Sequence, residues 1–179
     1  MTNTIQSPGS KNFLYLAIGS TATFLLYIIF VLTPSGLCFN VDSGPDSLGL
    51  AFSYTENMVL SFFESRSQEQ LLCYSQFLQI WDAMFAMIYT LMYASWIVYL
   101  FNKRWLALLP VLGMISDWSE NYIELLMIKT YTNAGAVSET IVSLGSGINS
   151  FKWVVSSLTY LVILIGIIIA IRSFFSKAR

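Results

Sequence analysis

The chain has 179 residues, of which 56% are hydrophobic and 11% are charged; its mean hydropathy is +0.66 and its formal net charge is −1. Soluble domains usually carry about a quarter charged residues, so this composition excludes an ordinary soluble domain and predicts an integral membrane protein. The absence of histidine from the sequence argues against a zinc or haem site and against histidine acid/base chemistry. We therefore expect no cofactor, no bound metal and no nucleic-acid partner.

The first predicted membrane span covers residues 13–32. Its apolar run is longer than that of a signal peptide, and no small-residue cleavage site follows it before Pro34, so we expect an anchor that is retained. A spanning helix needs about 20 apolar residues, and the length of the chain fits four such helices. The others are expected at 77–101, 105–128 and 148–171. The predicted fold is all-α, a four-transmembrane-helix bundle that forms one membrane domain over residues 1–179.

The long segment 33–76, between the first two spans, is predicted to be an outer loop with structure of its own. Residues 34–49 are rich in Pro, Gly, Ser and Asp and are expected to be irregular. The stretch "TENMVLSFFESR" has apolar residues at helical spacing after a plausible Thr55 cap, which predicts a short amphipathic helix on the outer membrane surface. Farther on, "SQEQ" (67–70) has the form of a capping box and indicates that the second helix begins before its span.

The two cysteines flank this outer loop. Cys38 follows the first span closely, and Cys73 comes just before the second. In an oxidising compartment they could form a disulfide that clamps the loop across the helix ends. In a reducing compartment they would be two free thiols at the membrane edge, and the sequence leaves both alternatives open.

Basic residues indicate the orientation of the chain. With four spans, both termini share a side with the connection between the second and third spans. Six of the nine basic residues fall on that side: Lys11, Lys103, Arg104, Arg172, Lys177 and Arg179. The positive-inside rule predicts that this side is cytoplasmic. The segment 129–147, on the opposite side, holds three glycines and several hydroxyls and is predicted to be a connector.

The third span carries a stripe of polar residues in its second half. Asp117, Glu120, Asn121 and Glu124 are spaced i, i+3, i+4 and i+7, which places them on one face of a helix. A charged side chain that faces lipid costs about 3 kcal/mol or more, so such residues nearly always face a bundle interior or a wet cavity. We expect the stripe to face the other spans.

Two other spans offer partners at the same level. In the second span, Asp82 lies on one face with several aromatic residues, including Tyr89 and Tyr93. In the fourth, Lys152 and Ser156 lie on a polar face that also holds Asn149 and Thr159. The predicted topology brings these groups together with the stripe in the outer half of the membrane, and we expect an acidic pocket there.

The predicted pocket has more carboxylates than cations. Four carboxylates beside one lysine cannot all stay ionised in a low-dielectric site, so some are protonated or a cation is present. The first alternative suits acid/base chemistry, and the second suits an amine or ammonium ligand held by ion pairing and cation–π contact. A Ca²⁺ or Mg²⁺ site is the least favoured alternative, because few backbone ligands are available. The polar groups could also serve only to join the helices to one another.

Two resemblances bear on the fold and the ligand. The stretches "SRSQEQLLCYSQFLQIWDAMFAMIY", "DWSEN" and "NSFKW" together resemble a group of small four-span membrane proteins of unassigned function. The acidic residue early in the second span, Asp82 in "QFLQIWDAMF", and the long first outer loop are similar to EXPERA-domain proteins, the family of the sterol isomerase and sigma-2 receptor proteins. That resemblance implies a cavity open to the membrane that takes sterols or cationic amphiphiles. The concentration of acidic groups in the third span departs from the family.

These observations predict a membrane protein that binds an amphiphilic or lipid-like ligand, with isomerase-type acid/base chemistry as an option. Asp117 and Glu120 would be the acid/base pair and Asp82 a second carboxylate. The expected ligand-binding residues are Asn121, Glu124, Lys152, Tyr89, Tyr93 and Ser156.

The alternatives are a non-catalytic subunit whose polar stripe serves assembly and a small transporter that acts as an oligomer. The expected partners are membrane lipids, an amphiphilic or cationic small molecule, and a homo-oligomer or larger membrane complex. Tyr99, Trp105 and Trp153 are predicted to anchor the spans at the membrane interfaces.

Overall fold

The computed structural model describes residues 10–41 and 46–177. Within these ranges the chain is helical and contains no strand. Asp42 of the outer loop and the C-terminal Arg179 lie outside the described residues, as does the side chain of Lys177. Three helices are long and apolar enough to cross a membrane: Lys11–Phe39, Gln68–Phe101 and Glu139–Ser176. This agrees with a membrane location.

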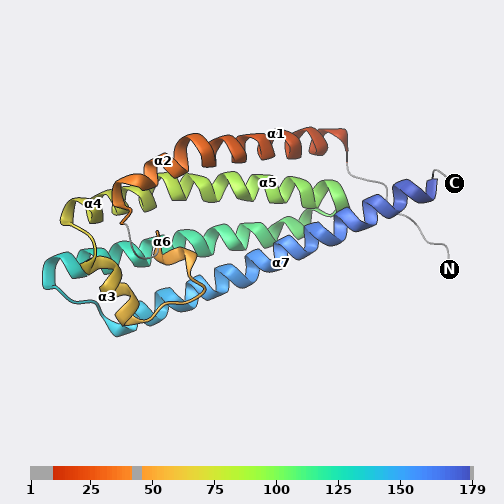
Figure 1. Ribbon diagram of the computed structural model, residues 1–179. Coiled ribbons are helices and arrows are strands. Elements are labelled where there is room, and N and C mark those ends of the chain that lie inside the picture. Colours follow the sequence, from red (N-terminus) through yellow and green to blue (C-terminus); the bar gives the residue numbers. More distant parts are fainter. Residues whose placement is uncertain (1–9, 42–45, 178–179) are drawn as a thin grey trace.

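The chain forms four long helical segments, and each runs antiparallel to the one before it (Figure 1). The first joins α1 (Lys11–Tyr27), a π-helical turn (Ile28–Leu32) and α2 (Thr33–Gly36), and the second joins α4 (Gln68–Gln76), a π-helical turn (Phe77–Asp82) and α5 (Ala83–Phe101). The other two are α6 (Leu108–Ala134) and α7 (Glu139–Lys177). The start of α1 and the end of α7 lie at one end of the molecule, and the short α3 (Glu56–Glu64) lies at the other.

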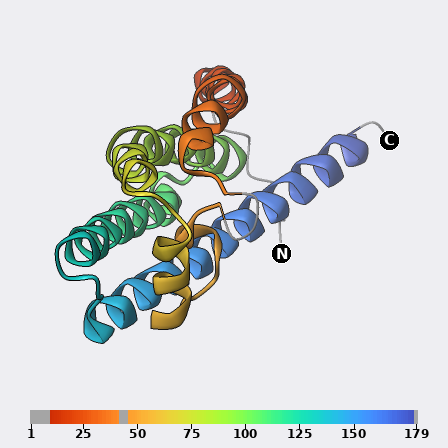
Figure 2. The ribbon, with the colours of Figure 1, turned by 60° about the vertical axis from the view of Figure 1, so that its left-hand side comes forward.

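The helices pack in pairs rather than as a symmetric bundle. α6 packs along α7, α1 packs mainly on α5, and α5 also touches α6 and α7. Figure 2 shows α1 and α7 on opposite sides of α5. Trp96 Nε1 donates to Thr21 Oγ1 (2.9 Å) and Tyr27 Oη donates to the Trp81 carbonyl (2.9 Å), so side-chain hydrogen bonds join the first pair of segments.

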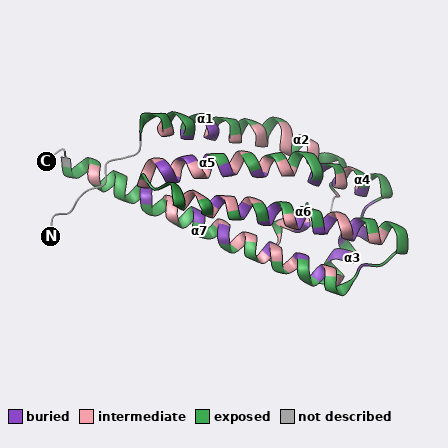
Figure 3. Cartoon of the chain, turned by 180° about the vertical axis from the view of Figure 1, so that it is seen from behind, coloured by how far each residue is buried: buried purple, intermediate pink, exposed green. Residues whose placement is uncertain are grey.

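The buried core lies at the α3 end of the molecule. Phe62, Phe63, Val59 and Tyr74 are buried there, where α3, α4 and α6 meet (Figure 3). The outward faces of α1 and of the C-terminal half of α7 instead expose large apolar side chains, among them Leu25, Leu26, Leu164 and Ile168. Exposed apolar helix faces of this kind are typical of contact with lipid.

The helix caps and the cysteine pair follow the sequence signals. Thr55 Oγ1 accepts from the Met58 amide (3.4 Å) at the start of α3, and Ser67 and Gln70 form the capping box that begins α4. Cys38 and Cys73 form a disulfide, with Cα atoms 6.3 Å apart, which ties the end of the first helical segment to α4. The short helix expected after Thr55 is α3, and its apolar residues Phe62 and Phe63 are buried against the rest of the protein. Its position on the outer membrane surface stays a prediction.

The prediction that residues 129–147 form a connector is wrong over most of their length. α6 continues to Ala134 and α7 begins at Glu139, so only four residues lie between the two helices. Thr130 and Thr132 donate to carbonyls of their own helix, which accommodates polar residues without ending it. The helix ends at Gly135, whose φ of 67° is favourable for glycine and whose amide donates to the Tyr131 carbonyl (2.8 Å).

Candidate functional site

The polar stripe of α6 faces the interior of the chain. The exposed fractions of its four residues are 6% for Asp117, 0% for Glu120, 6% for Asn121 and 1% for Glu124. The i, i+3, i+4, i+7 spacing puts them on one side of the helix, and the neighbouring segments cover that side. The charged groups therefore find their partners within a single copy of the chain.

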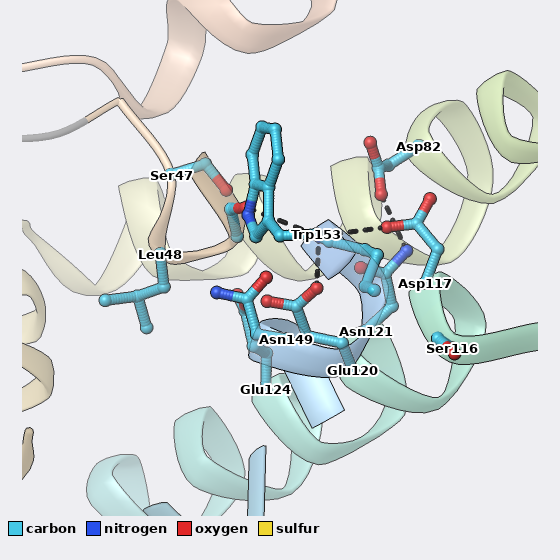
Figure 4. A network of polar contacts seen from close by, with 12 residues as sticks. Ser47, Leu48, Asp82, Ser116, Asp117, Glu120, Asn121, Glu124, Asn149 and Trp153 are labelled. Carbon is cyan, nitrogen blue, oxygen red and sulfur yellow. Dashed lines mark hydrogen bonds and ion pairs between the residues drawn. The ribbon is translucent and has the colours of Figure 1, made fainter. Parts of the chain in front are cut away.

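Lys152 of α7 is the cation at the centre of the site. Its Nζ lies 3.2 Å from Asp117 Oδ1 and forms a second ion pair with Glu120 Oε2. Figure 4 shows these contacts as dashed lines between α7 and α6. Because buried charges are stable only when paired, Lys152 compensates two carboxylates that the interior would otherwise not accommodate.

The loop before α3 reaches into this charged centre through its backbone. The Gly49 carbonyl accepts hydrogen bonds from Lys152 Nζ (3.3 Å) and Trp153 Nε1 (3.1 Å). A Cβ atom at residue 49 would lie 3.2 Å from both Lys152 Nζ and Glu120 Oε1, so glycine permits this close approach. The loop thus covers the ion pairs on the α3 side.

Asp82 lies at the end of the π-helical turn that joins α4 to α5. Its Oδ2 accepts from Asn121 Nδ2 (2.7 Å), and the same amide group donates to the Leu78 carbonyl in the turn (3.3 Å). π-helical turns disturb the regular ladder of backbone hydrogen bonds and are frequent at functional sites. No lysine or arginine in the part of the chain that the structure describes forms an ion pair with Asp82.

Tyr74 of α4 links the end of the stripe to the loop. Its hydroxyl donates to Glu124 Oε2, lies 3.0 Å from Ser47 Oγ and accepts from the Leu48 amide (3.4 Å). Tyr74 is fully buried, whereas Ser47 is half-buried. A chain of hydrogen-bonding groups therefore leads from Glu124 toward the surface.

Four buried oxygen atoms near these contacts have no hydrogen-bond partner among the described residues: Tyr54 Oη, Glu120 Oε1, Glu124 Oε1 and Asn149 Oδ1. Asn149 of α7 lies beside Glu120 and Glu124 in Figure 4, and its Nδ2 donates a hydrogen bond to the Ala51 carbonyl (2.6 Å). Burial, reinforced by the negative charge of Glu124 and Glu120, raises the pKa of Tyr54, so its phenol stays neutral.

A cavity of about 420 Å³ adjoins the charged centre. Asp82, Asp117 and Lys152 line its polar part, and Phe24, Phe85 and Trp153 line its aromatic part. Tyr89 Oη, also in the lining, donates to Asp117 Oδ2 (3.2 Å). Since Phe24 belongs to α1 and Trp153 to α7, the cavity lies between two helices that pack on different partners.

The structure brings together all nine residues that the sequence analysis singled out. Glu120 forms an ion pair with Lys152 outside the lining of the cavity. The other eight line the cavity: Asp82, Tyr89, Tyr93, Asp117, Asn121, Glu124, Lys152 and Ser156. The prediction that Trp153 is an interface anchor is wrong, because its indole donates to the Gly49 carbonyl and lines the cavity. Its spacing of four residues from Asn149, on the polar face of α7, was the signal available in the sequence.

Three further participants carried no clear signal in the sequence. Tyr74, Gly49 and Tyr54 reach the site from outside the four predicted spans. No group of three or more Cys, Asp or Glu residues within the described ranges is arranged to hold a metal ion. Comparison of the chain with protein-family models, with curated proteins and with solved structures gives no match.

Proposed function

We propose that the chain is a four-span membrane protein that binds an amphiphilic molecule bearing an amine or ammonium group. The ammonium group would sit at Asp82, and the apolar part would extend between α1 and α7 toward the lipid. The observation that carries this proposal is the cavity, which joins Asp82, a carboxylate that forms no ion pair among the described residues, to a set of aromatic rings. Carboxylates and aromatic faces are the groups that recognise ammonium ions.

α6 would be the fourth span. Its 27 residues extend roughly 40 Å at 1.5 Å per residue, more than the roughly 30 Å of the hydrocarbon core. Its three carboxylates make α6 less apolar than the three other long helices, but these carboxylates are buried in the protein and do not face the lipid. The basic side of the bundle, with Lys103 and Arg104, would be cytoplasmic, and α3 would lie on the opposite side.

The electrostatics favour Asp82 over the other carboxylates as the ammonium site. Asp117 and Glu120 already share Lys152, and Glu124 accepts from Tyr74. Asp82 accepts a side-chain hydrogen bond from the Asn121 amide and forms no ion pair among the described residues, so a ligand cation would supply a direct charge partner. If the ligand is also transformed by acid/base chemistry, Asp82 is better placed to contact it than Glu120, because Asp82 lines the cavity and Glu120 does not.

The burial of the stripe counts against the assembly alternative. A stripe that paired with another membrane protein would be open to that partner, whereas Glu120 and Glu124 are almost wholly covered within one chain. The EXPERA likeness implies the same class of ligand, a cationic amphiphile, and stays a prediction.

The test uses two probes of equal chain length, a long-chain alkylamine and the corresponding alcohol, added to the protein in lipid nanodiscs. Binding is followed by the fluorescence of Trp153, identified by its loss in Trp153→Phe. We expect the amine to bind more tightly than the alcohol, and Asp82→Asn to lower the affinity for the amine roughly tenfold or more, since a charge-assisted hydrogen bond contributes about 1.5–3 kcal/mol.

Glu69→Gln is the matched control, because Glu69 is exposed on α4 and lies outside the cavity. Its affinity for the amine should equal that of the wild type. Equal binding of amine and alcohol, or an Asp82→Asn variant that binds the amine as well as the wild type does, would contradict the proposal.

A further inference from the structure

The Glu120–Glu124 pair contains more acceptors than donors. Glu120 Oε2 is engaged by Lys152 and Glu124 Oε2 by Tyr74, and the second oxygen of each carboxyl group is buried without a partner among the described residues. Glu120 and Glu124 are four residues apart, one helical turn, on the buried face of α6, so their side chains are neighbours. An ionised carboxylate only accepts hydrogen bonds, so contact between the two requires a proton on one of them.

A separate group points at the same place. Asn149 Oδ1 is an acceptor without a partner within the described ranges, its residue is 0% exposed, and Figure 4 shows the amide beside both carboxyl groups. Three buried acceptor oxygens without a partner among the described residues leave this part of the interior short of hydrogen-bond donors. A single proton on Glu124 Oε1 would turn one of these acceptors into a donor for another.

We propose that Glu120 and Glu124 form a buried proton-binding site, in which the proton is bound to Glu124 and forms a hydrogen bond to Glu120. We propose further that Tyr74 and Ser47 connect this site to the surface. The inference stands on these contacts alone and does not depend on which ligand the cavity takes.

The charges around the pair decide which carboxyl group is protonated. Lys152 of α7 pairs with Glu120 and with Asp117, which favours the ionised form of Glu120 over that of Glu124. Glu124 forms no ion pair among the described residues, and its neighbours from other segments are the neutral phenols of Tyr74 and Tyr54, with Lys152 and Asp82 farther off. The proton therefore resides on Glu124.

The path to the surface follows the observed hydrogen bonds. Tyr74 Oη passes its proton to Glu124 Oε2 and takes one from Ser47 Oγ, which is replenished by solvent water. As Glu124 gains a proton at Oε2, it passes the one at Oε1 to Glu120. Ser47, Tyr74 and Glu124 then each hold as many protons as before, and Glu120 transiently holds the one proton that was taken up from the solvent. The reverse sequence releases a proton to the solvent.

The test is infrared spectroscopy of the purified protein in lipid nanodiscs, without added ligand, since protonated and ionised carboxyl groups absorb at separate frequencies. At neutral pH we expect a protonated-carboxyl band that disappears in Glu124→Gln and shifts in Glu120→Gln. It should persist in Glu69→Gln, whose carboxyl group is exposed. Glutamine keeps the size and hydrogen-bonding capacity of a protonated glutamate, so these variants should fold.

The connection is tested by the rate at which this band shifts after transfer to heavy water. Tyr74→Phe and Ser47→Ala should slow the exchange roughly tenfold or more, because each removes a hydroxyl group from the path. Tyr54→Phe is the matched control: it also removes a buried hydroxyl near the carboxyl groups, but one outside the hydrogen-bonded chain, and it should leave the rate unchanged.

Two outcomes would overturn the inference. Absence of the band from the wild-type protein, together with melting that depends on sodium but not on potassium, would show that a metal cation occupies the site instead of a proton. Exchange that is equally fast in wild type, Tyr74→Phe and Ser47→Ala would show that the proton leaves by another route.

Discussion

Replacing Lys152 by methionine tests the charge balance at the centre of the bundle. The ammonium group pairs with Asp117 and Glu120 and donates to the Gly49 carbonyl, and the side chains of the three charged residues are 13%, 9% and 1% exposed. Methionine keeps most of the apolar stem of lysine but removes the charge. Two buried carboxylates would then lose their cation.

Breaking a buried ion pair by removing one partner costs about 3–5 kcal/mol, because the remaining charge is left uncompensated. For a chain of this length, such a loss lowers the melting temperature by on the order of 10 °C. The measurement is thermal unfolding in one detergent, followed by circular dichroism. Lys103→Met is the matched control, since Lys103 is exposed in the connection between α5 and α6, and its effect should stay within about 0.5 kcal/mol.

A double variant separates charge compensation from packing. Glu120→Gln in the Lys152→Met background neutralises one of the two unpaired carboxylates and should recover roughly half of the lost stability, if the two pairs contribute equally. The reasoning is refuted if Lys152→Met melts like the wild type, or if the double variant is no more stable than the single one.

Three further predictions concern packing, the disulfide and the topology. Gly145→Ala should lower the free energy of unfolding by about 1–3 kcal/mol, because the new Cβ would lie 2.5 Å from Tyr54 Oη and 2.8 Å from Ile123 Cγ2. Gly147→Ala in the same helix meets open space and should be neutral or stabilising by up to about 1 kcal/mol. Equal melting temperatures for the two variants would contradict this prediction. Replacing both Cys38 and Cys73 by serine should cost about 2–4 kcal/mol, since the disulfide bridges a separation of 35 residues, and an unchanged melting temperature would rule out a stabilising clamp. Single cysteines introduced at Asn102 and at Asn133, which are exposed in or next to the connections at either end of α6, should react with a membrane-impermeant maleimide from opposite sides of the membrane; labelling from one side would refute the spanning of α6.

The sequence by itself determined the helical class, the membrane character and the composition of the candidate site. Apolar runs predict helices because a spanning backbone must satisfy its own hydrogen bonds, and the spacing of Asp117, Glu120, Asn121 and Glu124 places them on one face whatever surrounds the helix. The capping box at Ser67 was equally readable, because the residues that form it are three positions apart in the chain. These are local properties, and the sequence contains them directly.

The ends of the helices were harder to predict from the sequence, because hydropathy indicates which residues can face lipid and not where a helix ends. α6 continues past its apolar part through threonines that donate to carbonyls of their own helix, and α7 begins at Glu139, before its apolar part, so most of the predicted connector is helical. The end of α6 depends on the backbone conformation of Gly135. One glycine among three in that segment performs this role, and composition alone does not distinguish it.

Only the tertiary structure decided which faces meet. Periodicity places Lys152 on the polar side of α7, but the packing of α7 against α6 selects Asp117 and Glu120 as its ion-pair partners, and within the described ranges Asp82 forms no ion pair. The loop contacts are even less local: Gly49 reaches Lys152 across 103 positions of sequence through a backbone carbonyl, a group that every residue carries. A contact made by a group common to all residues leaves no mark on the sequence, so it emerges only when the chain is folded.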